Sequence, residues 1–340
     1  MGQEGILILG SNHPAALELI YSSELAKLGI RNKILGIQNL FLAYYTKSIL
    51  NKLIFRLGIS KIESIIQNKI KTEVLEFTPK TVLVFKGMEI QPKTLEWIKS
   101  KGIQVLNYNP DSPFIFSGRG SGNRNVTNSI TLYDCYITYD KTINEELRNI
   151  AVKSAIIPFG FDSSGFNYKD LEEKDEVLKL CFLGNADKFR IDFLVQIAQK
   201  GVKIDVYGEN WSDCKLHENI STFGPKYGSE FWRILQKYAL QINLLRPHNL
   251  HSHNMRSFDI PGAGGIMLAP RTPDHQTYFT ETTEVFLFSD INEALQHIQF
   301  ILHLSFNERN KIRQYARLKA KSHHTYTHRT LQLVQYLNAQ

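Results

Sequence analysis

Short apolar runs alternate with segments of helical periodicity along the whole chain, and this alternation constrains the fold more than any other feature. In the first half, helical patterns at 14–29, 41–76 and 94–102 alternate with apolar runs at 5–10, 81–86, 103–108, 135–139 and 155–158. In the second half, helical patterns at 188–200, 229–238, 291–303 and 307–321 alternate with apolar runs at 178–183, 203–207, 240–245, 265–269 and 284–288. Such alternation predicts parallel sheets with helices on both faces.

The repetition of this pattern over 340 residues indicates two α/β domains of Rossmann-like, doubly wound type. We expect an N-terminal domain over 1–160 and a C-terminal domain over 161–325, facing a central cleft. The stretch 159–176 is rich in glycine and serine and then charged, which predicts a linker. In such folds ligands bind at the carboxyl ends of the strands, so functional residues are expected in the loops there.

The net charge of +7, from 40 lysines and arginines against 33 acidic residues, favours anionic partners. Nucleotide phosphates and an acidic membrane surface fit this charge, whereas the scattered distribution argues against a nucleic-acid binder. The three cysteines lie far apart, which predicts free thiols in a reducing compartment. With no apolar run of about 20 residues and no signal-peptide pattern, we expect a cytoplasmic protein.

Two residues of the first half are candidate catalytic groups because they follow predicted strands. His13 lies in GSNHPAALE, where it serves either as an acid–base or sugar-contacting group or as part of a loop in which Ser11 or Asn12 caps the next helix. Asp111 lies in NYNPDSPF, either as a carboxylate facing the cleft or as the residue that closes a turn.

In the second half, three charged residues follow predicted strands. Arg190 lies in FLGNADKFR, Glu209 in YGENW and Arg246 in NLLRPHNLH. We expect all three to lie at the binding edge of the second sheet. Arginine offers a bidentate fork to phosphate oxygens, which makes Arg190 and Arg246 candidates for an anion site.

The segment HNMRSFDIPGAGGIMLAPRT combines a charged pair with a run of glycines. Arg256 and Asp259 stand three residues apart, so one helical turn would place both on the same face. There the arginine would hold a phosphate and the aspartate would accept two ribose hydroxyls, while Gly264 and Gly265 let a nucleotide approach the backbone. The alternative is an ion pair beside glycines that end a helix.

No group of residues has the spacing of a metal site. His248, His251 and His253 lie close together but lack a cysteine or carboxylate partner. The chain has no Asp-x-Asp, the usual clamp for a divalent metal on a nucleotide sugar, and no phosphate-binding P-loop. We therefore expect neither a metal nor a cofactor.

The segment NMRSFDIPGAGGIMLAPRTPDHQTYF resembles the C-terminal signature of the group-1 type glycosyltransferases, in the spore-maturation-protein (CgeB)-like subgroup. That signature is roughly Arg-x-Phe-Glu-Ile-Pro-Ala-x-Gly-Gly, with Asp259 in place of the glutamate. The stretches IPFGFD, CFLGNADKFR, VYGENW and HTYTHR also look similar, in order and spacing, as does KGMEIQPKTLEWIKSKGIQVLNYNPDSP in the first half.

This resemblance implies a GT-B fold whose C-terminal domain holds the donor, with a final helix over 326–340 that packs back toward the N-terminal domain. Asp259 would bind the ribose, Arg256 and Arg190 the diphosphate, and Gly264 and Gly265 would border the donor. His251 stands eight residues before Asp259, where retaining members carry an acid, so the stereochemical outcome stays open.

The function that this resemblance implies is metal-independent transfer of a sugar from a UDP-, GDP- or dTDP-linked donor. The acceptor would be a glycan, a lipid-linked molecule or a protein. Two alternatives remain, a sugar-nucleotide epimerase of similar fold and a non-catalytic module that binds a nucleotide sugar or polyanion. The basic balance also favours contact with the inner face of an acidic membrane.

Overall fold

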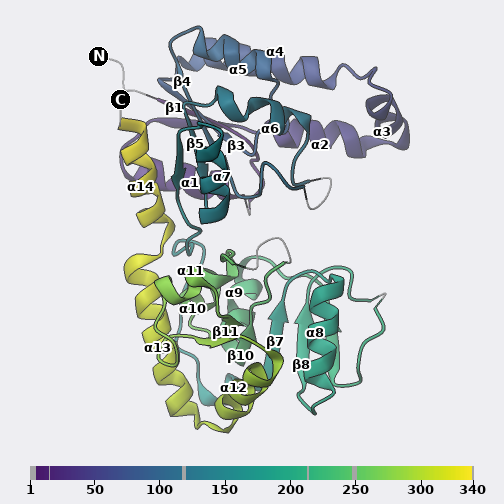
Figure 1. Cartoon of the computed structure of the whole chain (residues 1–340), viewed down its shortest axis with the longest axis vertical. Helices are drawn as coiled ribbons and strands as arrows, with labels where there is room; N and C mark the ends of the chain where they lie inside the picture. Colours follow the sequence, from purple (N-terminus) through teal and green to yellow (C-terminus); the bar gives the residue numbers. More distant parts are fainter. Residues whose placement is uncertain (1–4, 15, 117–119, 213, 247–250, 339–340) are drawn as a thin grey trace. The chain divides into compact units, whose positions relative to one another are not determined.

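The computed structural model describes residues 5–14, 16–116, 120–212, 214–246 and 251–338. The chain divides into two compact units (Figure 1). Unit 1 comprises Met1–Pro158 and Arg329–Gln340, and unit 2 comprises Phe159–His328. Each unit has one six-stranded sheet whose strands are all parallel. The predicted fold class, two Rossmann-like α/β domains, is confirmed.

The sheet of unit 1 has the order β2-β1-β3-β4-β5-β6. Its strands are β1 (Ile6–Leu9), β2 (Asn32–Leu35), β3 (Thr81–Phe85), β4 (Gln104–Asn109), β5 (Cys135–Thr138) and β6 (Ser154–Ile156). All five predicted apolar runs form strands. Strand β2 was missed because it is a sheet edge with the polar sequence NKIL, which leaves only Leu35 buried.

Helices cover both faces of this sheet. They are α1 (Leu17–Lys27), α2 (Ile37–Lys47), α3 (Ile49–Arg56), α4 (Ile62–Phe77), α5 (Pro92–Lys99), α6 (Arg124–Ser129), the 3₁₀ turn η1 (Ile130–Leu132) and α7 (Lys141–Asn149). The helical pattern over 41–76 is divided into three helices. Ser48 has an extended backbone and accepts the N–H of Asn51, so it ends α2 and caps α3, while Gly58 takes a left-handed conformation before α4.

The sheet of unit 2 has the order β12-β11-β10-β7-β8-β9. Its strands are β7 (Val177–Leu183), β8 (Ile204–Tyr207), β9 (Ile220–Phe223), β10 (Tyr238–Ile242), β11 (Met267–Pro270) and β12 (Phe286–Phe288). The missed strand, β9, is again an edge, and of its sequence ISTF only Ile220 is buried. These two edge strands lack the apolar run on which the prediction depends, unlike the edge strands β6 and β12.

The helices of unit 2 follow its strands in the same alternating manner. They are η2 (Glu173–Asp175), α8 (Lys188–Ala198), α9 (Gly228–Lys237), α10 (Arg256–Ala263), α11 (Pro273–Tyr278), α12 (Ile291–His303) and α13 (Phe306–His323). Helix α14 (Tyr326–Asn338) starts in unit 2, and its residues from Arg329 on are grouped with unit 1. No helix within the described ranges combines the length and apolarity that a membrane crossing requires.

The segment 159–176, expected to be a linker, is instead part of unit 2. Phe161 is buried, donates its N–H to the carbonyl of His324 at 2.7 Å, and its ring fills the space beside Gly262. At the other end of the segment, Glu176 is ion-paired with Arg309 and Arg313. The glycine and serine content suggested flexibility, but the aromatic side chains between them have apolar surface to bury.

Both sheets reverse their strand order at one point. In unit 1 the chain runs from β1 outward to β2 and then returns to β3 on the other side of β1. In unit 2 it runs from β7 through β8 to β9 and returns to β10 on the other side of β7. Loops diverge at such a switch point, which leaves a crevice at the carboxyl ends of the two central strands. The candidate sites of both units lie there.

Candidate active site

A pocket of about 280 Å³ lies at the switch point of unit 1. The loop after β1 contributes Gly10, Ser11 and His13 to its lining, the loop after β3 contributes Lys86 and Glu89, and α1 contributes Glu18. The pocket therefore contains the predicted His13, which is exposed, together with two carboxyl groups and a lysine that the sequence did not single out.

Glu18 holds the loop after β1 in place. Its carboxylate accepts the N–H of Ser11 at 2.7 Å and is buried. A Cβ at position 10 would lie 2.3 Å from Glu18 Oε1, so glycine is required there for this carboxylate to approach. The predicted cap by Ser11 or Asn12 is wrong, because α1 begins after Ala16 without a side-chain cap. Burial also raises the pKa of Glu18.

Glu89 has the ionisation behaviour of a general base. Burial raises its pKa to about 7, with a further rise from the charge of Glu18, while its own N–H and the charge of Lys86 act in the opposite direction. A carboxyl that titrates near neutral pH can take a proton from a hydroxyl under ordinary conditions. Glu89 lies in KGMEIQP, at the start of a stretch that looks similar to the glycosyltransferases, but the resemblance gave this residue no role; its place just after an apolar strand could also have pointed to it.

Asp111, the second predicted catalytic residue, is ion-paired. Its Oδ2 lies 2.6 Å from Lys86 Nζ, and its N–H donates to Asn109 Oδ1 at 3.0 Å, which forms the expected turn. Lys86 has a left-handed backbone with φ of 58°, a conformation that costs about 1–3 kcal/mol outside glycine and that clusters at functional sites. The catalytic roles of His13 and Asp111 stay predictions.

Three arginines come together at the switch point of unit 2. Burial lowers the pKa of Arg190, and the positive charges of Arg246 and Arg256 lower it further, while Asp187 opposes them. This effect on Arg190 indicates that the starts of α8 and α10 and the loop after β10 bring the three guanidinium groups within electrostatic range. Like charges gathered at a strand-end crevice are favourable only where an anion can neutralise them.

Arg190 is the most enclosed of the three. It donates to the carbonyls of Leu244 at 3.0 and 3.3 Å and of Asn185 at 3.0 Å, so it ties the loops after β7 and β10 together. Glu209 joins this arrangement from the loop after β8, since its N–H donates to Asn185 Oδ1 at 3.1 Å. Arg190 therefore contributes positive charge to the crevice while most of its hydrogen bonds hold the crevice's shape.

Arg256 and Asp259 lie on one face of α10, as their spacing predicted. Arg256 Nη1 is 2.6 Å from Asp259 Oδ2, and its guanidinium stacks 4.4 Å above the ring of Phe231. The Nε of Arg256 is buried and has no hydrogen-bond partner among the described residues. A buried guanidinium N–H without a partner is costly in the empty protein and is available to a ligand oxygen.

Asp259 is almost completely buried. This burial raises its pKa to about 6, Arg256 acts against the rise, and Asp162 adds to it. At neutral pH the side chain of Asp259 is therefore still a carboxylate, although burial disfavours its charge. One of its oxygens contacts Arg256. Asp162 comes from the segment expected to be a linker, which explains why the sequence did not indicate its contribution.

The glycines that follow α10 are explained by packing within unit 2. Gly264 takes a left-handed conformation at the end of the helix, with φ of 82°. A Cβ on Gly265 would lie 2.4 Å from the carbonyl oxygen of Leu235, and one on Gly262 would lie 2.3 Å from Phe161. This is the helix-ending alternative of the sequence analysis, so the expected role of Gly264 and Gly265 beside the donor stays a prediction.

His251 and Arg246 flank residues that the structure does not describe. Both are exposed. Residues 247–250 lie between them and outside the described ranges. They include His248, one of the three histidines considered as metal ligands in the sequence analysis. Their predicted donor-binding roles stay predictions.

A buried polar network that the sequence analysis missed holds the start of α10. Ser257 Oγ lies 2.8 Å from His275 Nε2, and His275 Nδ1 lies 2.7 Å from the carbonyl oxygen of Pro270. Because a carbonyl only accepts, Nδ1 carries the proton and Nε2 accepts from the serine. Burial lowers the pKa of His275 to about 4, which keeps the ring neutral. Ser257 also accepts a hydrogen bond from Asn243, so Ser257 and His275 together position the start of α10.

His253 extends the network toward the first residues of unit 2. Its Nδ1 lies 2.7 Å from Asp274 Oδ2, and its Nε2 accepts the N–H of Phe159 at 3.3 Å. Ser252 donates to the same carboxylate oxygen at 2.9 Å. The single His253 ring thereby connects its own segment to those of Phe159 and Asp274. Sequence reasoning weighed this histidine only as a metal ligand.

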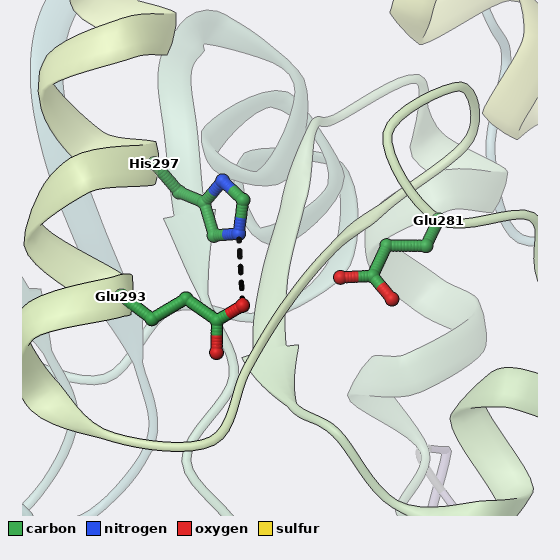
Figure 2. Close-up of side chains that lie close together, drawn as sticks. All are labelled: Glu281, Glu293 and His297. Carbon is green, nitrogen blue, oxygen red and sulfur yellow. Dashed lines mark ion pairs between the residues drawn. The ribbon is translucent and has the colours of Figure 1, made fainter.

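One group of side chains has the composition of a metal site. Glu281, Glu293 and His297 lie with their ligand atoms within 4.8 Å of one another, and Figure 2 shows Glu281 facing the two side chains from α12. However, Arg271 Nη2 lies 2.5 Å from Glu281 Oε1 and 2.6 Å from Glu293 Oε1. This guanidinium neutralises both carboxylates and lowers the pKa of Glu293 to about 2. The group is thus a surface ion-pair network.

Residues 190–335 match a family model described as glycosyl transferase-like, over less than half of the chain. The comparison with curated protein sequences finds no match. Among solved structures, sucrose-phosphate synthase from Thermosynechococcus elongatus is 13% identical, with a TM-score of 0.68 and 98% of each chain covered. The Anabaena protein HepE, in complex with UDP and glucose, is 11% identical, with a TM-score of 0.66 and 99% of this chain and 100% of that chain covered.

The chain has the two-domain GT-B fold. A Listeria monocytogenes protein assigned as a UDP-N-acetylglucosamine 2-epimerase shares it, at 11% identity and a TM-score of 0.59, with 99% of this chain and 96% of that chain covered. At such identities the likeness concerns the fold. The match to the family model contains the predicted donor-binding residues from Arg190 to Gly265.

Proposed function

We propose that this protein is a glycosyltransferase that moves a sugar from a nucleotide-sugar donor to a hydroxyl acceptor without a metal or other cofactor. The observation that carries the proposal is the gathering of Arg190, Arg246 and Arg256 around the switch point of unit 2, beside the buried Asp259. The glycosyl transferase-like match spans the same residues.

The donor would lie with its diphosphate on the arginines and its ribose on Asp259. The unpartnered Nε of Arg256 supports a phosphate contact, since a charged oxygen would satisfy it. Asp259 has a second carboxylate oxygen beyond the one that contacts Arg256, so it can accept from a ribose hydroxyl. UDP, GDP and dTDP sugars all contain these groups. Since HepE was solved with UDP and with UDP-glucose, uridine donors come first in a test.

The arginines would also serve the chemistry. Sugar transfer passes through an oxocarbenium-like state while negative charge grows on the departing nucleoside diphosphate. Fixed guanidinium groups stabilise that charge in place of the divalent metal that many transferases use. This supports the expectation of a metal-independent reaction.

The pocket of unit 1 would receive the acceptor. If the reaction inverts the anomeric centre, a base must take the proton of the acceptor hydroxyl. His13 and Asp111 are the candidates from the sequence, and Glu89 joins them because its pKa of about 7 suits a base, whereas Asp111 is ion-paired with Lys86. If the reaction retains the configuration, these residues position the sugar or acceptor instead.

The finer assignments are also proposals. They are membership of the spore-maturation-protein-like subgroup, a hexosyl or related transfer, and a glycan, lipid-linked or protein acceptor. A cytoplasmic location with contact to the inner membrane face belongs with them, on the basis of the net charge.

A thermal-shift panel of UDP, GDP, dTDP and CMP, each with its common sugar conjugates, tests the donor site. A ligand at 100 times its dissociation constant adds about 2.7 kcal/mol to the free energy of unfolding. We expect a rise in melting temperature with one nucleotide family, which Asp259→Asn reduces and Asp192→Asn, an exposed position on α8, leaves unchanged. If no nucleotide raises the melting temperature, the proposal fails.

An epimerase is the second candidate, favoured by the likeness to the Listeria protein. It would convert the donor with no acceptor present, whereas a transferase releases the nucleoside diphosphate in proportion to the acceptor supplied. Chromatography of the nucleotide pool after incubation with and without an acceptor mixture separates the two. Donor binding with no turnover in either case would indicate a binding module.

A further inference from the structure

The edge of unit 1 formed by α2 and α3 carries a concentration of exposed apolar side chains. They are Leu42, Ile49, Leu50, Leu53, Leu57 and Ile59, which we call the α3 apolar surface. These six are among 21 exposed large hydrophobic residues described in the whole chain, yet they occupy only 18 consecutive positions. An apolar surface gathered in this way indicates a binding surface, whereas scattered exposed leucines do not.

Helix α3 exposes a row of apolar side chains to solvent, whereas an amphipathic helix on a protein surface usually buries them. Ile49, Leu53 and Leu57 recur every four residues and point outward, with exposed fractions of 84%, 52% and 64%. The inner side is held by Phe55, whose ring packs 5.0 Å from Phe41 of α2. No residue of α3 is buried. In Figure 1 this helix lies at the end of α2 away from the sheet of unit 1, so its outer face has space for a partner.

The charge around this surface has one sign. The sequence contains no aspartate or glutamate between Glu24 and Glu63, although basic residues occur throughout that interval. Four of them lie on α3 or beside it, namely Lys52 and Arg56 on the helix and Lys47 and Lys61 on either side. Apolar side chains among lysines and arginines, with no acid in the same segment of the chain, match the chemistry of an anionic lipid surface, where the side chains enter the acyl boundary and the cations meet the headgroups.

A large apolar pocket adjoins the same surface. Its volume is about 610 Å³, and Leu42, Phe55 and Arg56 line it on the side of α2 and α3. Glu63 and Glu89 also line it, and Glu89 lines the pocket at the switch point as well. One pocket is therefore lined both by Leu42 of the α3 apolar surface and by the carboxyl group that the proposed function uses.

We propose that the α3 apolar surface docks unit 1 onto a lipid bilayer that contains anionic lipids. The leucines and isoleucines insert at the boundary between headgroups and acyl chains, and the four cations on and beside α3 contact the anionic headgroups. Docking in this way places the mouth of the apolar pocket at the lipid surface. The inference depends on surface chemistry alone and holds whether or not the protein transfers a sugar.

Co-sedimentation with vesicles tests the proposal. We expect the full-length chain to bind vesicles of phosphatidylcholine with phosphatidylglycerol and to bind pure phosphatidylcholine vesicles much more weakly. Leu57→Gln should lower the partition coefficient roughly tenfold. The matched control is Leu318→Gln on α13, which has the same exposed fraction of 64% and should change nothing. If Leu318→Gln weakens binding equally, or if Leu57→Gln has no effect, the proposal is wrong.

The charge contribution is tested separately. Lys47→Gln and Lys61→Gln should each weaken binding to the anionic vesicles roughly fivefold, and added salt should reduce the difference. The control is Lys311→Gln, an exposed lysine of α13. Equal binding to neutral and anionic vesicles would overturn the electrostatic part of the proposal.

A second copy of the chain is the competing occupant of the surface. Sedimentation equilibrium without lipid detects it, since a dimer that Leu57→Gln converts to monomer would show that the surface joins two copies and would overturn the proposal. All variants are first checked for an unchanged melting temperature. They are also checked for an unchanged nucleotide-induced thermal shift, so that failure of lipid docking is distinguished from failure of the donor site.

Discussion

Both units have a switch point in a parallel sheet, but the two switch points have opposite chemistry. In unit 1 the start of α1 and the loop after β3 bring the carboxyl groups of Glu18 and Glu89 into one pocket with a lysine. In unit 2 the starts of α8 and α10 and the loop after β10 contribute three arginines beside one buried aspartate. The parallel sheet determines where a ligand binds, and the loop residues determine which ligand. One crevice suits a hydroxyl and its proton, and the other suits a diphosphate.

The supporting structure differs as well. Around α10 of unit 2, a buried network that includes His253, Ser257 and His275 holds the charged residues in place. Around the pocket of unit 1, the support is Glu18 against Gly10 and the strained backbone of Lys86. A charged donor site needs preorganised polar groups, whereas an acceptor pocket can depend on shape.

The largest expected effect is that of Glu89→Gln on turnover. If Glu89 takes the proton of the acceptor, kcat falls roughly 100- to 10,000-fold while the donor affinity stays the same. In wild type, activity should rise with pH and level off above an apparent pKa near 7, because the base is the deprotonated form. Steady-state kinetics across pH check both points. Glu96→Gln, at an exposed position of α5, is the control. If the Glu89→Gln enzyme keeps full activity, Glu89 does not take the proton of the acceptor, and proton transfer no longer distinguishes the two crevices.

The next largest effect is expected at the switch point of unit 2, on the affinity for the donor. Arg256→Gln should weaken binding of the matching nucleoside diphosphate roughly 10- to 100-fold, since a hydrogen bond between charged groups contributes about 1.5–3 kcal/mol. Titration calorimetry measures this. Arg233→Gln on α9, whose side chain is 68% exposed, should leave the affinity unchanged. An unchanged affinity in Arg256→Gln would mean that the arginine group does not bind the phosphates.

A third prediction concerns the pH dependence of stability through Asp259. Its folded-state pKa of about 6 is above the ordinary 3.8, so between these values the folded state holds a proton that the unfolded state has released. The free energy of unfolding therefore declines as pH rises through this window, by up to about 3 kcal/mol, and is level above it.

Asp259→Asn should remove most of this decline and raise the melting temperature of the unliganded protein at pH 7, at the expense of donor affinity. Melting curves at pH 5 and pH 7.5 for this variant, wild type and Asp192→Asn provide the measurement. A wild-type protein with the same pH profile as Asp259→Asn would contradict the buried carboxylate.

The smallest effect is expected at the acidic group of Figure 2. Because Arg271 neutralises Glu281 and Glu293, neither a chelator nor added divalent cations should change the melting temperature. Glu281→Gln should cost less than about 1 kcal/mol, the usual range for a surface ion pair. A cation-dependent rise in melting temperature that Glu281→Gln abolishes would assign a metal site here.

Much of the fold follows from the alternation of apolar runs and helices, since ten strands have that signal in their own residues. The edge strands β2 and β9 do not, because their half-exposed positions tolerate polar residues, whereas the edge strands β6 and β12 keep apolar runs. The helical spacing of Arg256 and Asp259 likewise predicted their ion pair, because it depends on one turn of one helix. The segment 159–176 was misjudged because its composition conceals aromatic residues that pack on distant parts of unit 2.

The sequence by itself determined the strand-end loops in which chemistry would lie and the residues that local spacing joins. Only the tertiary structure decided which of those residues meet. Glu89 obtains its pKa from burial beside Glu18, more than 70 positions away, and Asp259 obtains its own from burial together with Asp162. Desolvation and charge act through space, so no pattern along the chain records them. For the same reason, the glycines beside α10 resembled a nucleotide contact in the sequence, although their close neighbours are side chains and a carbonyl of the protein itself.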